Sequence, residues 1–140
     1  MGLIWAEYLS VGNKVIDSDH KKLIVAVNSV ERAIEARDRD ALSSKFKVLE
    51  ILMHAHFENE EKIAKAANFP VSEINIGHRQ LMAEIKYMIN KLENTEGSWP
   101  DNLLTMYARY LNDWMIDHII EYDMEMKPVL QKYPYDFVSN

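Results

Sequence analysis

Four segments of this chain place apolar residues at alternating intervals of three and four, and each segment carries one histidine within that apolar stripe. This spacing is typical of one face of an α-helix that packs against a core. The histidines are His20, His56, His78 and His118. The chain must therefore form helices and also accommodate four imidazoles in or beside the core.

The pattern predicts an all-α protein, an up-down-up-down four-helix bundle with a non-helical N-terminal arm, in a single domain over 1–140. We expect the arm at 1–18, helices at about 19–37, 41–66, 72–93 and 101–121, and a C-terminal tail at 122–140. Pro70 and the run from Glu93 to Pro100 mark two of the links, because proline cannot continue a helix. Only four glycines and four prolines occur, which argues against a turn-rich β fold.

Composition excludes several classes of protein. The absence of cysteine excludes disulfides, zinc–thiolate sites, iron–sulfur clusters and cysteine nucleophiles. A net charge of −6 without a basic block argues against nucleic-acid binding. No apolar run approaches the roughly 20 residues that span a bilayer, and the N-terminus lacks the features of a secretory signal. We expect a cytoplasmic monomer that binds neither nucleic acid nor a membrane.

The four histidines are expected at one depth in the bundle. His20 and His56 lie about 19 and 17 residues from the turn between their helices, and His78 and His118 each lie about 19 residues from theirs. At about 1.5 Å per residue the mismatch is a few ångströms. Unpaired imidazoles in a core would cost several kcal/mol in lost hydration, and a metal ion removes that cost. The sequence therefore predicts a metal site.

Two carboxylates accompany these histidines. Glu60 follows His56 by four residues, which places both on one helix face. Asp123 follows His118 by five, about 140° around an ideal helix, so it reaches the same centre only if the chain bends. Imidazole and carboxylate without thiolate suit iron, manganese or zinc. Four histidines and two carboxylates exceed one tetrahedral zinc site and suit two bridged metals.

Two neighbouring residues are less specific. His54 lies two residues before His56 and points to another helix face, so we interpret it as a surface residue or a supporting one. Glu61 is interpreted as solvated, although it lies close enough to hold a ligand in place.

These residues make the chain resemble the hemerythrin family, particularly the bacteriohemerythrins, over nearly its whole length. The matching motifs are Trp5, Leu9-Ser10-Val11-Gly12, Ile16-Asp17, Asp19-His20-Lys21-Lys22-Leu23, His56-Phe57-x-x-Glu60-Glu61, Phe69-Pro70 and Trp114-x-x-x-His118-Ile119-x-x-x-Asp123.

The resemblance implies a non-heme centre of two iron ions with an oxo or hydroxo bridge, which the family holds with five histidines and two bridging carboxylates. Carried over by motif, His20 and His56 bind one iron, His78 and His118 bind the other, and Glu60 and Asp123 bridge them. The small-ligand pocket would be lined by Phe57, Ile74, Trp114, Met115 and Ile119.

One departure concerns the third block of the family, His-x-x-x-His. Ile74 stands four residues before His78. We align His78 with the second histidine because Leu81 follows it as the apolar residue of the family does. The alternative makes His78 the first, with Met82 in the second position. One ligand is missing in both cases; Glu73 or Asn75 would replace it if the helix start is distorted, and water is the simpler replacement.

With Ile74, each iron would keep two histidines and one open position. We therefore expect faster autoxidation, or reactivity towards peroxide or oxygen, compared with an intact site. The resemblance implies O2 binding for storage, delivery or sensing, with O2 or another small diatomic molecule or peroxide as the partner. The alternatives are a di-iron redox enzyme acting on peroxide, O2 or NO, and an iron-binding or signalling module. We expect a binding or carrier protein rather than an enzyme.

Overall fold

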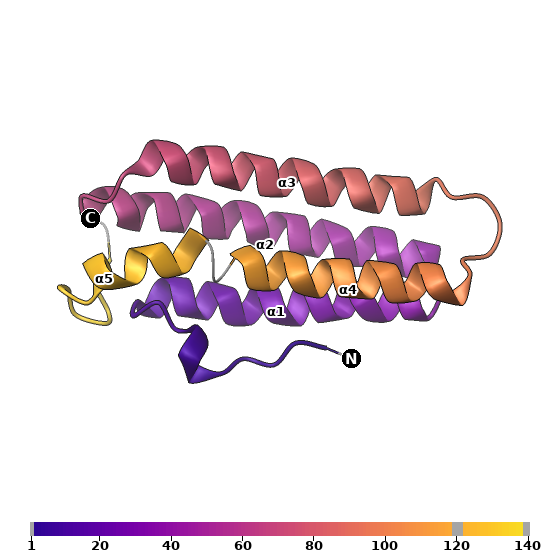
Figure 1. The fold of residues 1–140 in the computed structure, drawn as a ribbon, viewed down its shortest axis with the longest axis horizontal. Helices are drawn as coiled ribbons and strands as arrows, with labels where there is room; N and C mark the ends of the chain where they lie inside the picture. The colour runs from indigo at the N-terminus through magenta and orange to yellow at the C-terminus, as the bar shows by residue number, and fades with distance from the viewer. Residues whose placement is uncertain (1, 119–121, 139–140) are drawn as a thin grey trace.

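The computed structural model describes residues 2–118 and 122–138, and these residues form an all-α bundle. Four long helices lie side by side and successive ones run in opposite directions, which confirms the predicted fold class (Figure 1). They are α1 (Lys14–Glu35), α2 (Arg39–Ala66), α3 (Val71–Glu93) and α4 (Asp101–Asp117). The shorter elements among the described residues are the 3-10 helices η1 (Glu7–Leu9) and η3 (Asp123–Met126) and the α-helical turn α5 (Lys127–Leu130).

Helix α1 begins at Lys14, earlier than the expected position 19, because Asn13 caps it. The Asn13 side-chain oxygen accepts hydrogen bonds from the backbone N–H groups of Val15 and Ile16, at 3.0 and 3.2 Å. Its amide also donates to the carbonyl oxygen of Phe137 at 2.9 Å. The cap therefore depends on a residue near the other end of the chain, which local sequence does not reveal.

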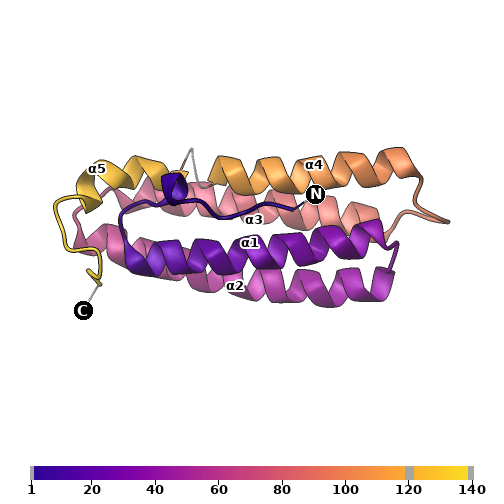
Figure 2. The same ribbon diagram turned by 90° about the horizontal axis from the view of Figure 1, so that it is seen from below.

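The N-terminal arm lies along the bundle (Figure 2) and is hydrogen-bonded to α1 near both of its ends. Asn28 exchanges two hydrogen bonds of 2.9 Å with the backbone of Leu3. Further along, the Asp17 carboxylate accepts hydrogen bonds from the backbone N–H of Val11 at 3.0 Å and from the Tyr135 hydroxyl at 2.9 Å. The arm and the C-terminal segment are thus held at the start of α1.

The end of the bundle where α1 meets α2 and α3 meets α4 is held by an arginine. The guanidinium of Arg39 donates to the backbone oxygens of Glu93, Thr95 and Gly97, at 2.9, 2.6 and 2.6 Å. It also lies over the ring of Trp99, 4.6 Å from its centroid. This contact fixes the α3–α4 loop, which lacks regular structure between the two helices (Figure 1).

The buried apolar residues form two clusters. The larger fills most of the bundle, and the smaller contains Val11, Ile16, Ile63, Ala64, Ala67, Ile74, Met126 and Leu130. On each long helix or its extension, the chain passes from one cluster to the other through a histidine or carboxylate, for example from Ile16 through His20 to Leu23. The polar residues therefore form a layer between two apolar regions. No helix in the described ranges is long and apolar enough to cross a membrane.

Candidate metal centre

Six side chains with metal-binding chemistry come from different elements and are all buried. His20 lies on α1, His56 and Glu60 on α2, His78 on α3, His118 directly after α4, and Asp123 at the start of η3. The exposed fraction is 3% for His78 and 0% for the other five. The four helices therefore bring the predicted histidines to one level of the bundle.

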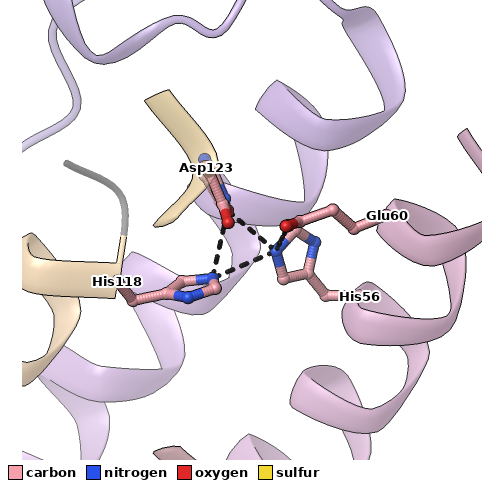
Figure 3. A group of neighbouring side chains, drawn as sticks. His56, Glu60, His118 and Asp123 are labelled. Atoms are coloured by element: carbon pink, nitrogen blue, oxygen red, sulfur yellow. Dashed lines mark hydrogen bonds and ion pairs between the residues drawn. The ribbon is translucent and has the colours of Figure 1, made fainter. Parts of the chain in front are cut away.

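Five of the six residues converge on one point. His20, His56, Glu60, His118 and Asp123 each offer one ligand atom, and these atoms lie within 4.8 Å of one another. The Oδ2 atom of Asp123 lies 3.1 Å from Nε2 of His118 and 3.3 Å from Nε2 of His56 (Figure 3). The same oxygen also contacts Nε2 of His20. Nε2 atoms of His56 and His118 are 3.1 Å apart. One carboxylate oxygen thus faces three imidazoles.

The sixth residue, His78, is joined to this group through Glu60. One Glu60 oxygen, Oε2, lies 2.9 Å from Nε2 of His56, and the other, Oε1, lies 3.2 Å from Nε2 of His78. The His78 ring stacks on Phe57, with ring centroids 3.9 Å apart and planes 12° apart. Glu60 therefore faces imidazoles from two helices.

Asp123 reaches the centre because it does not continue the α-helix that precedes His118. Helix α4 ends at Asp117, and Asp123 opens the 3-10 helix η3, so the 140° separation of an ideal helix does not apply. Next to Asp123, the ring of Tyr122 lies against Gly77 of α3. A Cβ atom on Gly77 would lie 2.8 Å from Cε1 of Tyr122, so only glycine permits this approach.

The charges of the cluster are strongly coupled. Burial would lower the pKa of His56, but hydrogen bonds to Asp123, Asp19 and Glu60 outweigh it and raise the pKa well above its usual value. Burial lowers the pKa of His118. Burial would raise the pKa of Asp123, but the neighbouring His118 and His20 hold it well below its usual range. In the metal-free chain, protons shared among these groups must balance the buried carboxylates.

The residues fit a metal ion. Nδ1 of His20, Nδ1 of His118 and Oδ1 of Asp123 are buried without a hydrogen-bond partner among the described residues. Three imidazole nitrogens around one carboxylate oxygen offer more lone pairs than hydrogen bonds can use, and a cation satisfies them together. Imidazole and carboxylate donors suit iron, manganese or zinc. The arrangement is that of a metal-binding cluster.

Two of the imidazoles, those of His56 and His78, each contact a carboxylate through Nδ1, and an asparagine amide donates to that carboxylate. Nδ1 of His56 lies 3.1 Å from Oδ2 of Asp19, and the amide of Asn59 donates to the same oxygen at 3.1 Å. A carboxylate that accepts the Nδ1 proton leaves Nε2 free to bind a metal. From the sequence, Asp19 was named only as part of the motif around His20. Its signal was its place directly before His20, about 100° around α1.

The matching pair around His78 of α3 consists of Glu61 of α2 and Asn75 of α3. Nδ1 of His78 lies 3.1 Å from Oε2 of Glu61, and the Asn75 amide donates to Oε1 of Glu61 at 2.7 Å. Asn75 therefore contacts the carboxylate that positions His78. Glu73 is exposed and does not belong to the five-residue cluster. Neither is placed as the replacement ligand considered above.

The residues expected around a small ligand are distributed over different regions. The Trp114 ring is stacked on His118 at 6.4 Å between centroids, and Phe57 lies edge-on to His118 at 5.4 Å. Met115 is fully buried in the larger apolar cluster. Ile74 is buried in the smaller apolar cluster instead. Ile119 lies outside the described residues.

Comparison with known proteins agrees with this geometry. Residues 11–130 match the model of the hemerythrin family, described as the hemerythrin HHE cation binding domain. A bacteriohemerythrin of Stenotrophomonas maltophilia (strain R551-3) is 27% identical over 124 residues, which cover 84% of this chain and 74% of that protein. A bacteriohemerythrin of Pseudomonas aeruginosa (strain LESB58) is 27% identical over 70 residues, covering 50% of this chain and 46% of that protein.

Proposed function

The chain belongs to the hemerythrin family, and from this membership and the buried cluster we propose that it binds O2 at a pair of iron ions in the bundle core. The iron pair would supply electrons and an open coordination position for a small ligand. The residues that would hold it are His20, His56, Glu60, His78, His118 and Asp123.

The observation that carries this proposal is the position of Glu60 between imidazoles of two helices. Its two oxygens face different histidines, His56 at 2.9 Å and His78 at 3.2 Å, as expected of a carboxylate that bridges two metals. Asp123 is the second proposed bridge, because its Oδ2 atom faces three imidazoles and its Oδ1 atom has no hydrogen-bond partner. We retain the pairing of His20 with His56 and of His78 with His118 as part of the proposal.

The surroundings of the cluster support binding of a small, uncharged molecule. Phe57 and Trp114 pack against His118, and both are at least 95% buried. Apolar walls exclude bulk water, which slows loss of electrons from a reduced metal to solvent species. A diatomic molecule such as O2 needs no polar partner beyond the metal.

The test begins with metal content. Protein produced with ample iron should contain two irons per chain, and the reduced protein should gain a visible absorption band on exposure to O2 that disappears under argon. A band that never reverses would contradict the carrier role. One iron or none would contradict the paired centre.

A second candidate function is reduction of peroxide or of O2 itself. Ile74 favours it, because the chain has no histidine there and α3 offers only His78 to the cluster. A metal with fewer protein ligands keeps positions open for water or peroxide. Turnover of hydrogen peroxide with an added reductant distinguishes this candidate from a reversible carrier, which would show a single slow oxidation.

A further inference from the structure

A pocket of about 320 Å³ opens between α2 and α3 beside the metal centre. Its lining residues are His54, Phe57, Glu58 and Glu61 of α2 and Asn75, His78, Arg79 and Met82 of α3. On each helix these residues are spaced by three and four, so they form two facing stripes. His78 belongs to both the pocket wall and the proposed metal centre.

From the mouth of the pocket towards the cluster, side chains that can bind a metal become progressively less exposed. The side chain of Glu58 is 68% exposed, that of Glu61 24%, that of His78 3% and that of Glu60 0%. The last three are in direct contact, since His78 lies 3.1 Å from Glu61 through Nδ1 and 3.2 Å from Glu60 through Nε2. His54 lies one helical turn before Glu58 on the same exposed face.

A buried centre of this kind needs a route for the metal ion. The proposed ligands are at least 97% buried, so an ion from solvent must exchange its water molecules for protein donors before it reaches them. Exchange in single steps avoids the large cost of a bare cation in an apolar interior. We propose that the α2–α3 pocket is the entry route for a divalent metal ion, with His54 and Glu58 as the first ligands and Glu61 as the next.

The ion pairs around the pocket are compatible with capture of a cation. Glu58 is paired with Lys62 at 3.1 Å, and both side chains are more than half exposed. An exposed pair of this kind is worth little free energy, so an incoming cation can displace the lysine. Glu61 is paired with His78 and held by Asn75, which fixes a carboxylate between the surface and the centre.

Arg79 lines the same pocket and carries the opposite charge. A guanidinium at the pocket wall repels a divalent cation and attracts an anion. The sign of its effect therefore separates a cation route from an anion route. This inference rests on the proposed function, because it concerns the metal of that same centre.

The test measures the rate at which metal-free, full-length protein takes up Co²⁺ alone, followed by the absorption of bound Co²⁺ after rapid mixing. The double variant His54→Ala/Glu58→Gln should take up Co²⁺ roughly tenfold more slowly at low salt. The final amount bound should equal that of the unmodified protein. The matched control is Glu50→Gln, which removes a carboxylate from the same helix that is paired with Lys86 at 3.3 Å and lines a different pocket.

The variant Arg79→Gln should accelerate uptake, and an unchanged free energy of unfolding would show that this opposite sign does not come from loss of stability. Equal rates for all variants at an unchanged final amount would overturn the entry route and leave the proposed function intact. Slower uptake by Arg79→Gln would also overturn it, because a cation that passes this pocket must enter faster once a positive charge is removed from its wall. If the unmodified protein binds no metal at equilibrium, the proposed function fails and the entry route with it.

Discussion

The carboxylate of Glu61 lies 3.1 Å from Nδ1 of His78, on the side of the imidazole opposite Glu60. Asn75 holds the other oxygen of Glu61 at 2.7 Å, so the carboxylate cannot turn away freely. This contact keeps Nε2 of His78 directed towards Glu60. The only histidine that α3 offers to the centre is thus fixed by two residues outside it.

Replacing Glu61 should weaken metal binding without unfolding the bundle. In Glu61→Gln an amide oxygen accepts the Nδ1 proton less strongly, and metal affinity should fall by about 10- to 100-fold. Equilibrium titration with Co²⁺ in the presence of a competing chelator measures the change. The control is Glu73→Gln, since Glu73 is an exposed carboxylate on α3, the helix that carries His78. Equal affinities for the two variants would mean that Glu61 has no positioning role.

A histidine at position 74 should destabilise the metal-free protein and should slow autoxidation of the iron-loaded protein. Ile74 is 6% exposed and packs with Ile63 and Met126, so Ile74→His places an imidazole among apolar side chains. The metal-free protein should lose about 1–3 kcal/mol of unfolding free energy. In the iron-loaded protein the added nitrogen should slow autoxidation. Chemical denaturation and the decay of the O2-dependent absorption measure the two effects, and an unchanged decay would show that position 74 does not reach a metal.

The metal-free protein should become less stable as the pH rises above about 7. The folded-state pKa of His56 lies well above 6.5, so its proton stabilises the fold fully below 6.5, and this stability is lost as the pH rises through the folded-state pKa. His118 has a lowered pKa, so its contribution is lost on acidification below 6.5 and is complete at higher pH. Asp123 contributes above 3.8 throughout this range.

Urea denaturation at about pH 7 and pH 9 with a chelator present measures this dependence. The metal-loaded protein should show the opposite trend, because metal ligation requires neutral imidazoles and therefore strengthens as the pH rises. The same slope in both forms would show that the histidines do not exchange protons for metal.

Adding one methyl group at position 77 should weaken metal binding, although residue 77 is not a proposed ligand. In Gly77→Ala the new Cβ would lie 2.8 Å from a ring atom of Tyr122, so the ring must move, and Asp123 is the next residue. We expect metal affinity to fall by roughly tenfold, since outer contacts of this kind change affinity by that order. The double variant Gly77→Ala/Tyr122→Leu removes the clash and should recover much of the affinity. Failure of this rescue would mean that the alanine acts through α3 alone.

Arg39 should matter for stability and not for metal content. Its guanidinium holds three backbone oxygens of the α3–α4 loop and covers Trp99. Arg39→Ala should lower the unfolding free energy by about 1–3 kcal/mol, because hydrogen bonds to a charged group are lost. The iron content per folded chain should stay the same. A loss of iron would show that the two ends of the bundle are coupled.

The fold and the depth of the histidines follow from periodicity, because a helix converts spacing along the chain into a face and a height. The interval from His20 through Leu23 to Val27 already predicts an imidazole within an apolar stripe. The start of α1 could not be predicted in this way. Asn13 caps it while bonding to Phe137, and such a contact is set by packing between distant segments.

The environment of the ligands was the less predictable part of the site. Asp123 reaches the centre because regular α-helix ends at Asp117, and helical spacing alone gave an angle of about 140°. Asp19 contacts His56 only because α1 and α2 pack at a particular rotation. Local patterns specify which face a residue occupies, whereas partners across helices depend on how the faces meet.

The contact between His20 and Asp123 joins residues 103 positions apart, on either side of most of the chain. A metal ion bound to both would act as a reversible cross-link in a protein that has no cysteine. Unlike a disulfide, this cross-link exists only while the ligands of the folded bundle are in place, so the free energy of metal binding adds to the stability of the fold. The helices could thus separate only as the ion is released, and refolding with metal present would end with its capture between the two halves of the chain.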